Sequence, residues 1–467
     1  MVPSSPPRIP ADAADVTQAG SLRWIAAAAG SIPEMSQVQI EQDIDLAADV
    51  FGPGGRVLFG AGHLAPVVQV LNSKPPDPDA QLRLTLGDLF SPRGGRHAHY
   101  RRPQLQVHDA ATARSVLDTL RAAVAEPGEP LLVYLAGHGD MGEKPKDNRM
   151  LLWGQTEIRV TDLGAVLDQA KRPVQVVATT CFSGGFGELV FRQAEQARGP
   201  ARTLRCGLFA APWDLEASGC DPNPDRATQQ GYGLHFLNAL RGRDRDGAVV
   251  PLGDIDLDQD GAVSLLEAHT RVRLFSEAAD VPTSTSERWL RHAAPEQGKL
   301  TPVTLPEDDH VIEVLSDRLG LRGPPSLAYA DLDRRDQVIA QLQRSANQAS
   351  QAEALAYREA AASLLAVWPV LDDPWHPEFA ATLADHASAI TTHLAESEAY
   401  RTYLSATAAA GEAHEAVWVQ RTAAAPVERL VRALDNRELA SRLAAEGGAA
   451  WGIYEALLDC ERTVTTQ

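Results

Sequence analysis

The chain has 467 residues, of which 44% are hydrophobic and 22% are charged, a composition typical of a globular protein with more than one domain. Its formal net charge is −19, from 43 basic and 62 acidic residues. This acidic balance argues against a nucleic-acid partner, because phosphate contacts require clustered Lys and Arg. The one basic cluster, residues 91–103, is short and broken by Pro and Gly, so we interpret it as a solvated loop.

The four cysteines, Cys181, Cys206, Cys220 and Cys460, lie far apart in the sequence and include no CxxC pair. This spacing predicts neither a disulfide framework nor a zinc site, and a reducing compartment is expected. The N-terminal apolar stretch, residues 22–30, follows a polar, Pro-rich lead and is too short to span a bilayer. We therefore expect a cytoplasmic protein with no signal peptide and no membrane contact.

Residues 1–50 are expected to form a lead segment with one short helix around residues 38–51. From residue 56 onward, continuous apolar runs alternate with amphipathic ones. The predicted strands are residues 56–62, 130–140, 173–181 and 204–212, and the predicted helices are residues 111–126, 160–171, 186–198, 231–240 and 264–279. This alternation predicts an α/β fold over residues 51–300, with a mostly parallel sheet covered by helices on both faces.

The pattern changes after residue 300. Residues 301–325 contain several prolines and are predicted to be a linker. Residues 326–467 are Ala-rich, and their apolar positions recur at helical spacing, for example Val427, Leu430 and Leu434. We expect a separate all-helical accessory domain with these stripes, Val431 included, in its core.

Two predicted strands end in Gly-bearing turns that carry groups suited to covalent catalysis: His138 in "AGHGD" and Cys181 in "TTCFSGG". In open α/β sheets, ligands bind at the carboxyl ends of the strands. A thiol is a nucleophile as its thiolate, and a nearby imidazole can take its proton. The backbone N–H groups of Gly139 and Cys181 are placed to face an oxyanion. The alternative is a structural cysteine beside a hydrogen-bonded histidine, the usual fate of an unrelated pair.

The order "LLVYLAGHGD", a hairpin "MLLWGQTEIRV", a helix and "VQVVATTCFSGGF" resembles the caspase/haemoglobinase clan of cysteine peptidases, nearest its legumain-like branch. Residues 206–237 are similar to the segment of that branch that follows the nucleophile and forms part of the substrate cleft. The resemblance covers roughly residues 56–295. It implies a three-layer α/β/α sandwich with a Cys181 nucleophile and a His138 partner.

The same resemblance makes Gly139 an oxyanion donor. Legumain-like peptidases also have an asparagine after their first strand that orients the histidine. At the matching place this chain has "GAGH", residues 60–63, which leaves that role unfilled or filled differently. The same stretch contains G-x-G-x-x-A, residues 60–65, a weak dinucleotide-binding pattern that would need a helix directly after it.

Specificity is less clear from the sequence. Several relatives that cleave after Arg or Lys have an aspartate two residues before the nucleophile, where this chain has Thr179. Asp221 and Asp225 are the remaining acidic candidates. An acidic pocket there would favour a basic P1 residue by charge pairing, whereas aspartates in loops commonly cap turns.

Residues 256–267, "DLDQDGAVSLLE", match the calcium-loop pattern D-x-D-x-D-G-x₅-E. The expected Ca²⁺ ligands are carboxylates, one carbonyl and one hydroxyl, from Asp256, Asp258, Asp260, Ala262, Ser264 and Glu267. Gly261 permits the sharp turn. No helix is predicted to enter the loop and no second loop pairs with it, so we expect an isolated site. Its role, structural or regulatory, stays open, and the alternative is a solvated acidic turn.

These features predict a cysteine endopeptidase that cleaves protein or peptide substrates through Cys181 and His138. Calcium dependence and self-processing are further hypotheses, and a bacterial regulatory or defence role follows by analogy only. The basic stretch at residues 192–205 is the expected self-cleavage site, and the helical domain is expected to hold a regulatory protein or ligand. Two alternatives remain. One is a catalytically idle calcium-binding scaffold or sensor, and the other is a thiol transamidase that passes the acyl group to an amine.

Overall fold

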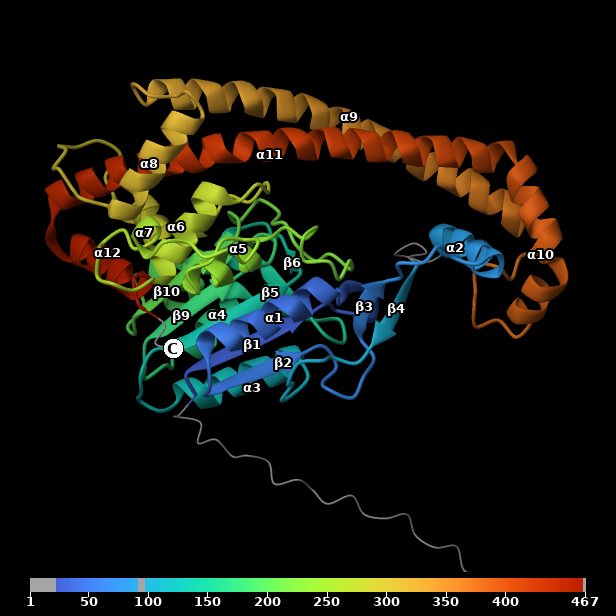
Figure 1. The fold of residues 1–467 in the computed structure, drawn as a ribbon, viewed down its shortest axis with the longest axis horizontal. Coiled ribbons are helices and arrows are strands. Elements are labelled where there is room, and N and C mark those ends of the chain that lie inside the picture. Colours follow the sequence, from blue (N-terminus) through green and yellow to red (C-terminus); the bar gives the residue numbers. More distant parts are fainter. Residues whose placement is uncertain (1–21, 91–96, 465–467) are drawn as a thin grey trace, which may run out of the picture.

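The computed structural model describes residues 22–90 and 97–464. At its centre is a six-stranded sheet in the order β11-β10-β9-β5-β1-β2, in which only the β10–β11 pair is antiparallel (Figure 1). The strands are β1 (Trp24–Ala29), β2 (Gly55–Phe59), β5 (Leu131–Gly137), β9 (Val174–Ala178), β10 (Arg205–Phe209) and β11 (Thr283–Ser284). The predicted α/β fold with a mostly parallel sheet is confirmed.

Helices cover both faces of this sheet. One face packs against α1 (Val38–Phe51), α5 (Tyr232–Leu240) and α6 (Leu265–Phe275), and the other against α3 (Ala113–Val124) and α4 (Val160–Leu167). Successive strand residues point to opposite faces, so Ala26 and Ala28 of β1 belong to one core and Ala27 and Ala29 to the other. Strands buried on both faces read as continuous apolar runs, as β1 and β5 do.

Two smaller sheets project from the central one. They contain β3 (Val68–Leu71) with β4 (Ala98–Arg101), and β6 (Gly139–Asp140) with β7 (Arg149–Leu152) and β8 (Thr156–Arg159). The α2 helix (Pro78–Phe90) lies between β3 and β4 in the chain. The hairpin of β7 and β8 agrees with the sequence pattern. The solvated loop predicted at residues 91–103 is wrong where the structure describes it, because residues 98–101 form β4; residues 91–96 lie outside the described residues.

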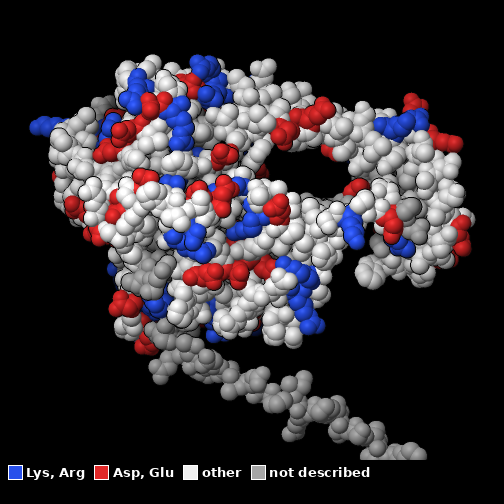
Figure 2. Space-filling view, viewed as in Figure 1, with Lys and Arg blue, Asp and Glu red and all other residues white. Residues whose placement is uncertain are grey.

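The C-terminal part is helical, as predicted. Its helices are α7 (Thr285–Ala293), α8 (Pro306–Arg318), α9 (Ser326–Leu365), α10 (Phe379–Glu396), α11 (Glu398–Glu446) and α12 (Gly448–Glu461). We call α9, α10 and α11 the helical arm. The long helices α9 and α11 lie side by side and extend past the sheet to α10 and α2 (Figure 1). There Leu86 and Leu89 of α2 pack with Leu383 and Ile390 of α10. Figure 2 shows an opening between the arm and the rest of the protein.

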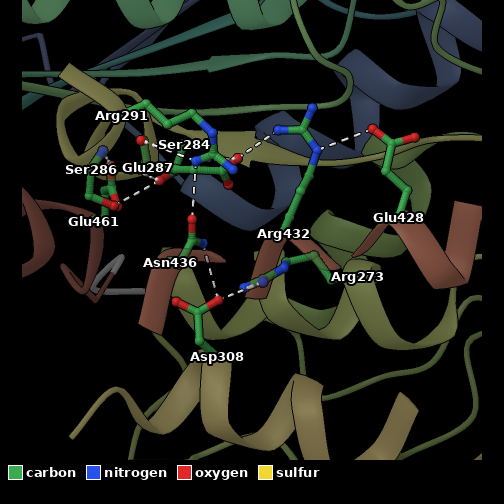
Figure 3. A network of polar contacts seen from close by, with 10 residues as sticks. All are labelled: Arg273, Ser284, Ser286, Glu287, Arg291, Asp308, Glu428, Arg432, Asn436 and Glu461. Carbon is green, nitrogen blue, oxygen red and sulfur yellow. Dashed lines mark hydrogen bonds and ion pairs between the residues drawn. The ribbon is translucent and has the colours of Figure 1, made fainter. Parts of the chain in front are cut away.

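A polar network fixes the root of the arm to the body (Figure 3). Arg432 of α11 donates to Glu287 of α7 at 2.7 Å, and Asn436 donates to Asp308 of α8. Burial alone would raise the pKa of Glu287, but the guanidinium groups of Arg291 and Arg432 lower it to about 2. The carboxylate therefore stays charged and paired at neutral pH. The predicted apolar stripe lies beneath, with Val427, Leu430, Val431 and Leu434 all buried.

The last helix returns to the sheet. A disulfide joins Cys206 of β10 to Cys460 of α12, 254 residues apart. The sequence predicted no disulfide framework, and this one long-range bridge, which spacing did not indicate, runs against the expected reducing compartment. Glu461 of α12 accepts hydrogen bonds from the N–H and hydroxyl of Ser286, so the C-terminal helix packs as part of the body.

Three boundaries differ from the sequence prediction. The lead segment of residues 1–50 includes β1 and most of α1, which belong to the central sheet and one of its helical layers; residues 1–21 lie outside the described residues. The predicted linker, residues 301–325, includes the buried helix α8. The helix predicted at residues 186–198 is instead a 3-10 helix, Ser183–Val190, followed by two short 3-10 turns.

Among the helices of the described ranges, none combines the length and the apolar character needed to cross a membrane.

Candidate functional site

His138 and Cys181 follow two strands that pair directly in the sheet. His138 comes immediately after β5, and Cys181 lies three residues beyond the end of β9. In the register of these strands Leu135 pairs with Ala178, so both chains leave the sheet at the same edge. A Cβ atom on Gly139 would lie 2.2 Å from the carbonyl oxygen of Cys181. The two turns are therefore in contact, and only glycine allows this approach.

The turn of Cys181 is held by an asparagine from the β7 side. Asn148 is buried, and its amide donates to the carbonyl oxygens of Phe182 at 2.9 Å and Trp213 at 2.6 Å. Phe182 has a left-handed backbone, with φ of 59°, which turns the chain sharply after the cysteine. Its N–H donates to the carbonyl of Leu215. Asn148 thus joins the cysteine turn to the segment that follows β10.

The sulfur of Cys181, a half-buried residue, contacts that segment. The N–H of Ala217 donates to Sγ at 3.4 Å, and the thiol faces the carbonyl oxygen of Ala217 at 3.5 Å. Burial raises the pKa of Cys181 to about 11, and the hydrogen bond from Ala217 only partly opposes this. The carboxylate of Glu216 also disfavours the anion. The thiol is therefore protonated at neutral pH in this conformation.

The imidazole of His138 is oriented by residues before α1. Its Nε2 lies 3.0 Å from Oε1 of Gln37 and 3.0 Å from the carbonyl oxygen of Met35. Both partners are acceptors, so Nε2 carries a proton and donates to them. Gln37 is 5% exposed and forms the N-cap of α1. While these contacts hold, any proton exchange with a thiol uses the other ring nitrogen, Nδ1.

Gly139 is free to offer its backbone to a ligand. It pairs with Met150 across β6 and β7, and the N–H of Leu151 donates to the carbonyl of His138. This pattern makes Gly139 and Met150 a non-hydrogen-bonded pair, so the ladder with β7 does not use the N–H of Gly139. The N–H lies beside the cysteine turn, where an oxyanion donor would be required.

A groove of about 510 Å³ lies between the cysteine turn and the helical arm. The body contributes Phe182, Asp214 and Glu216, and the arm contributes residues of α9 and α11 that include Glu415 and Trp418. Within residues 22–90 and 97–464, no ion pair neutralises Asp214, Glu216 or Glu415. The groove is thus lined by aromatic and acidic side chains together with His414 and Arg421, and it adjoins Phe182, the residue that follows Cys181.

The three residues predicted to set specificity have other contacts. Thr179 donates its N–H to the carbonyl of Leu135 and faces the sheet. Asp221 accepts from the N–H of Asn223, and Asp225 accepts from the N–H of Ala227, both within turns. The two aspartates therefore cap their loop, which was the alternative explanation for them.

The predicted calcium loop has converging carboxylates. Ligand atoms of Asp256, Asp258 and Asp260 lie within 4.8 Å of one another. Asp256 accepts from the N–H groups of Asp260 and Gly261, and Gly261 has a φ of 91° that favours glycine.

Glu267 folds back onto the same loop. Its carboxylate accepts from the N–H of Leu257 at 2.6 Å and from the N–H and hydroxyl of Ser264. Ser264 also caps α6. Carboxylates and a backbone carbonyl, here Ala262, are oxygen donors of the kind that Ca²⁺ prefers, so the residues present fit a calcium ion. The Ser264 hydroxyl would have to exchange its bond to Glu267 to act as a ligand.

The dinucleotide pattern at residues 60–65 has no helix after it. The next element is β3, at Val68–Leu71. The N–H of Gly60 donates instead to the carbonyl of Ala28 in β1. A dinucleotide fingerprint requires a helix N-terminus at this point, so this alternative is not supported.

Sequence reasoning missed Gln37 and Asn148. Gln37 lies in the turn after β1, and the sequence analysis did not predict this strand. The usable signal was the apolar run at residues 22–30 followed by a polar turn. Nothing in the sequence around Asn148 distinguishes it from other loop asparagines.

The chain matches no protein-family model and no curated protein.

Proposed function

We propose that the protein is a cysteine endopeptidase of the caspase-like type in which Cys181 is the nucleophile and His138 its proton partner. The observation that supports this most strongly is the contact between the two strand-end turns, where Gly139 meets the carbonyl of Cys181. A thiol, an imidazole and a free N–H then share one edge of a parallel sheet, which is where such sheets bind ligands.

In the proposed reaction, His138 takes the proton from Cys181 through Nδ1, and the thiolate attacks the peptide carbonyl. The N–H groups of Gly139 and Cys181 stabilise the oxyanion. Collapse of this intermediate breaks the C–N bond, and His138 gives its proton to the leaving amine. Water then hydrolyses the thioester with His138 as base, which returns the thiol and releases the acid. Gln37 fills the orienting role by holding Nε2.

In this proposal the described conformation would be a resting state. Burial holds the pKa of Cys181 near 11, and Ala217 covers the sulfur. A substrate carbonyl must displace Ala217 before attack. The same observation favours the alternative of a catalytically idle scaffold, which would keep the thiol covered permanently.

The substrate we infer is an extended polypeptide with a basic side chain. It would lie in the groove beside Phe182, where the three carboxylates of Asp214, Glu216 and Glu415 outnumber the one guanidinium, that of Arg421, and form no ion pair with it among the described residues. Charge pairing in a partly desolvated groove favours Lys or Arg. The arm overhangs the groove, so a flexible segment fits it better than a folded surface.

Self-cleavage after Arg205, at the end of the basic stretch of residues 192–205, would occur between molecules. Arg205 begins β10, whereas Cys181 follows the end of the neighbouring parallel strand β9. Arg205, the last residue of the basic stretch, and the sulfur therefore lie toward opposite edges of the sheet.

Ca²⁺ would be held by Asp256, Asp258, Asp260 and Glu267, with the carbonyl of Ala262. When bound, it would supply positive charge that clamps this loop to the N-terminus of α6. The N–H of Leu265, at that terminus, donates to the carbonyl of Thr463, so the loop also adjoins the C-terminal segment.

A regulatory or defence role in bacteria remains an analogy. A cytoplasmic location remains a prediction, and the disulfide at Cys206 weighs against it because thiols there are kept reduced.

A peptide-library cleavage assay with and without Ca²⁺ tests the proposal. Cys181→Ala should abolish cleavage, whereas Cys220→Ala, which removes the other free thiol, should retain it. Addition of an amine nucleophile separates a peptidase, which releases acids, from a transamidase, which releases amides. Equal turnover by the two alanine variants, or none by the wild type under any condition, would overturn the assignment.

A further inference from the structure

The segment that covers Cys181 is tied to a buried carboxylate. The N–H of Ser218 donates to Oδ1 of Asp280 at 2.6 Å, and the neighbouring residue, Ala217, contacts the sulfur through both its N–H and its carbonyl. Asp280 has no exposed surface. It lies between α6 and β11, outside the chain segments of the proposed catalytic residues.

The connection that carries Asp280 is held by an arginine of the helical arm. Arg429 of α11 is 1% exposed. Its guanidinium donates to three carbonyl oxygens of this connection, those of Ser276 at 2.8 Å, Ala278 at 2.8 Å and Asp280 at 2.7 Å. One side chain of the arm therefore closes the loop from residue 276 to residue 280.

Asp280 and Arg429 also carry opposite charges in the protein interior. Burial raises the pKa of Asp280 to about 6, against the opposing effects of the Ser218 N–H and the charge of Arg429. Burial lowers the pKa of Arg429 to about 10. Both groups are thus ionised near pH 7.5, and each depends on the other because an unpaired buried charge is costly.

We propose that Arg429 and Asp280 are positioning residues through which the helical arm holds the 214–218 segment over Cys181 and keeps its thiol unreactive. The proposal rests on the assignment of Cys181 as nucleophile. The coupling runs from Arg429 to the 276–280 connection, from Asp280 to Ser218, and from Ala217 to the sulfur. Any event that shifts α11 relative to α6 loosens the cover, because each link is a direct hydrogen bond.

The substitution Arg429→Lys tests this coupling. Lysine keeps the positive charge but cannot donate to three carbonyls in the planar fork that arginine provides. The matched control is Arg432→Lys. Arg432 is also on α11 at the root of the arm, with its side chain 20% exposed, but it pairs with Glu287 and Glu428 and does not contact the 276–280 connection (Figure 3).

The measurement is the rate of alkylation of Cys181 by iodoacetamide in the full-length protein, resolved by mass spectrometry across pH 6 to 10. Each unit of decrease in a thiol pKa raises the thiolate fraction tenfold and the rate about threefold, after its lower nucleophilicity is counted. Greater exposure of the sulfur raises the alkylation rate further. We expect Arg429→Lys to raise the rate at pH 7.5 at least about fivefold and to move the pH profile to lower pH, and Arg432→Lys to stay within about twofold of the wild type.

Asp280→Asn provides a second variant in case Arg429→Lys fails to fold. It keeps the volume and an oxygen acceptor for Ser218 but removes a negative charge near the sulfur, so the rate should also rise. An unchanged rate in a folded Arg429→Lys or Asp280→Asn protein, or an equal rise in Arg432→Lys, would overturn the proposal. Alkylation needs no turnover, so a coupled thiol in a protein without peptidase activity would refute the proposed function alone.

Discussion

The contact between Gln37 and His138 leads to a quantitative prediction for Gln37→Ala. The substitution removes one acceptor, 3.0 Å from Nε2, and leaves the second, the carbonyl of Met35, at the same distance. A hydrogen bond to a charged group contributes about 1.5–3 kcal/mol. Because the carbonyl of Met35 remains, we expect the lower value. A loss of about 1.5 kcal/mol in transition-state stabilisation corresponds to about a tenfold decrease in kcat/KM.

The assay is kcat/KM for a cleaved peptide as a function of pH. Because Gln37 touches the histidine and not the substrate groove, the loss should fall on kcat, with KM nearly unchanged. Gln37→Glu is the informative companion, since a carboxylate still accepts from Nε2–H and stabilises the imidazolium. It should restore much of the activity and raise the pKa of the acid limb of the profile. A Gln37→Ala enzyme with wild-type kcat, or with a defect confined to KM, would refute the role of Gln37 in orienting the imidazole.

Three further predictions concern stability. Cys460→Ser should lower the free energy of unfolding, measured in urea titrations, by about 5 kcal/mol. This is the chain-entropy value for a disulfide that joins residues 254 apart in the sequence. Wild-type protein under a reductant should show the same decrease. Burial raises the pKa of Glu461 to about 8, so native protein keeps a proton that the unfolded chain has lost above about pH 5. The free energy of unfolding should therefore fall by about 1.3 kcal/mol from pH 7 to 8.5 in wild type relative to Glu461→Gln, and equal slopes would contradict this. Ca²⁺ at a hundredfold excess over its Kd should raise the free energy of unfolding by about 2.7 kcal/mol in urea titrations. Glu267→Gln should abolish this gain, and the exposed Glu277→Gln should retain it.

Much of the fold was predictable because its central strands are buried on both faces. The run that became β5 is continuous and apolar, that of β9 is interrupted only by Gln175, and the turns after them contain His138 and Cys181. Helix α1 begins and ends at the predicted residues. In each case the local pattern of apolar residues was enough to predict the element.

Strand β1 could not be recognised in the same way. Its sequence is "WIAAAA", and alanine has little preference for strands. The run forms a strand because it lies between β2 and β5, where small side chains fit beneath the helices of both faces, a tertiary effect. The missed strand hid Gln37, which comes shortly after it.

Long-range pairs were equally inaccessible. Cys206 and Cys460 meet because α12 returns to β10 after the full length of the arm. The coupling of Arg429 to Asp280 spans 149 residues and involves backbone carbonyls, which carry no sequence signature. Predictions of this kind depend on the topology, which the local sequence does not contain.

The central claim, that Cys181 attacks a peptide carbonyl with the help of His138, is tested most directly by capturing the acyl-enzyme. Rapid acid quench during turnover of a cleaved peptide, followed by mass spectrometry of the digested protein, should find one acyl group per chain on Cys181. The adduct should decay as product forms, and it should be absent in His138→Ala. No adduct on any cysteine during demonstrable cleavage, or an adduct on Cys220 instead, would contradict the account.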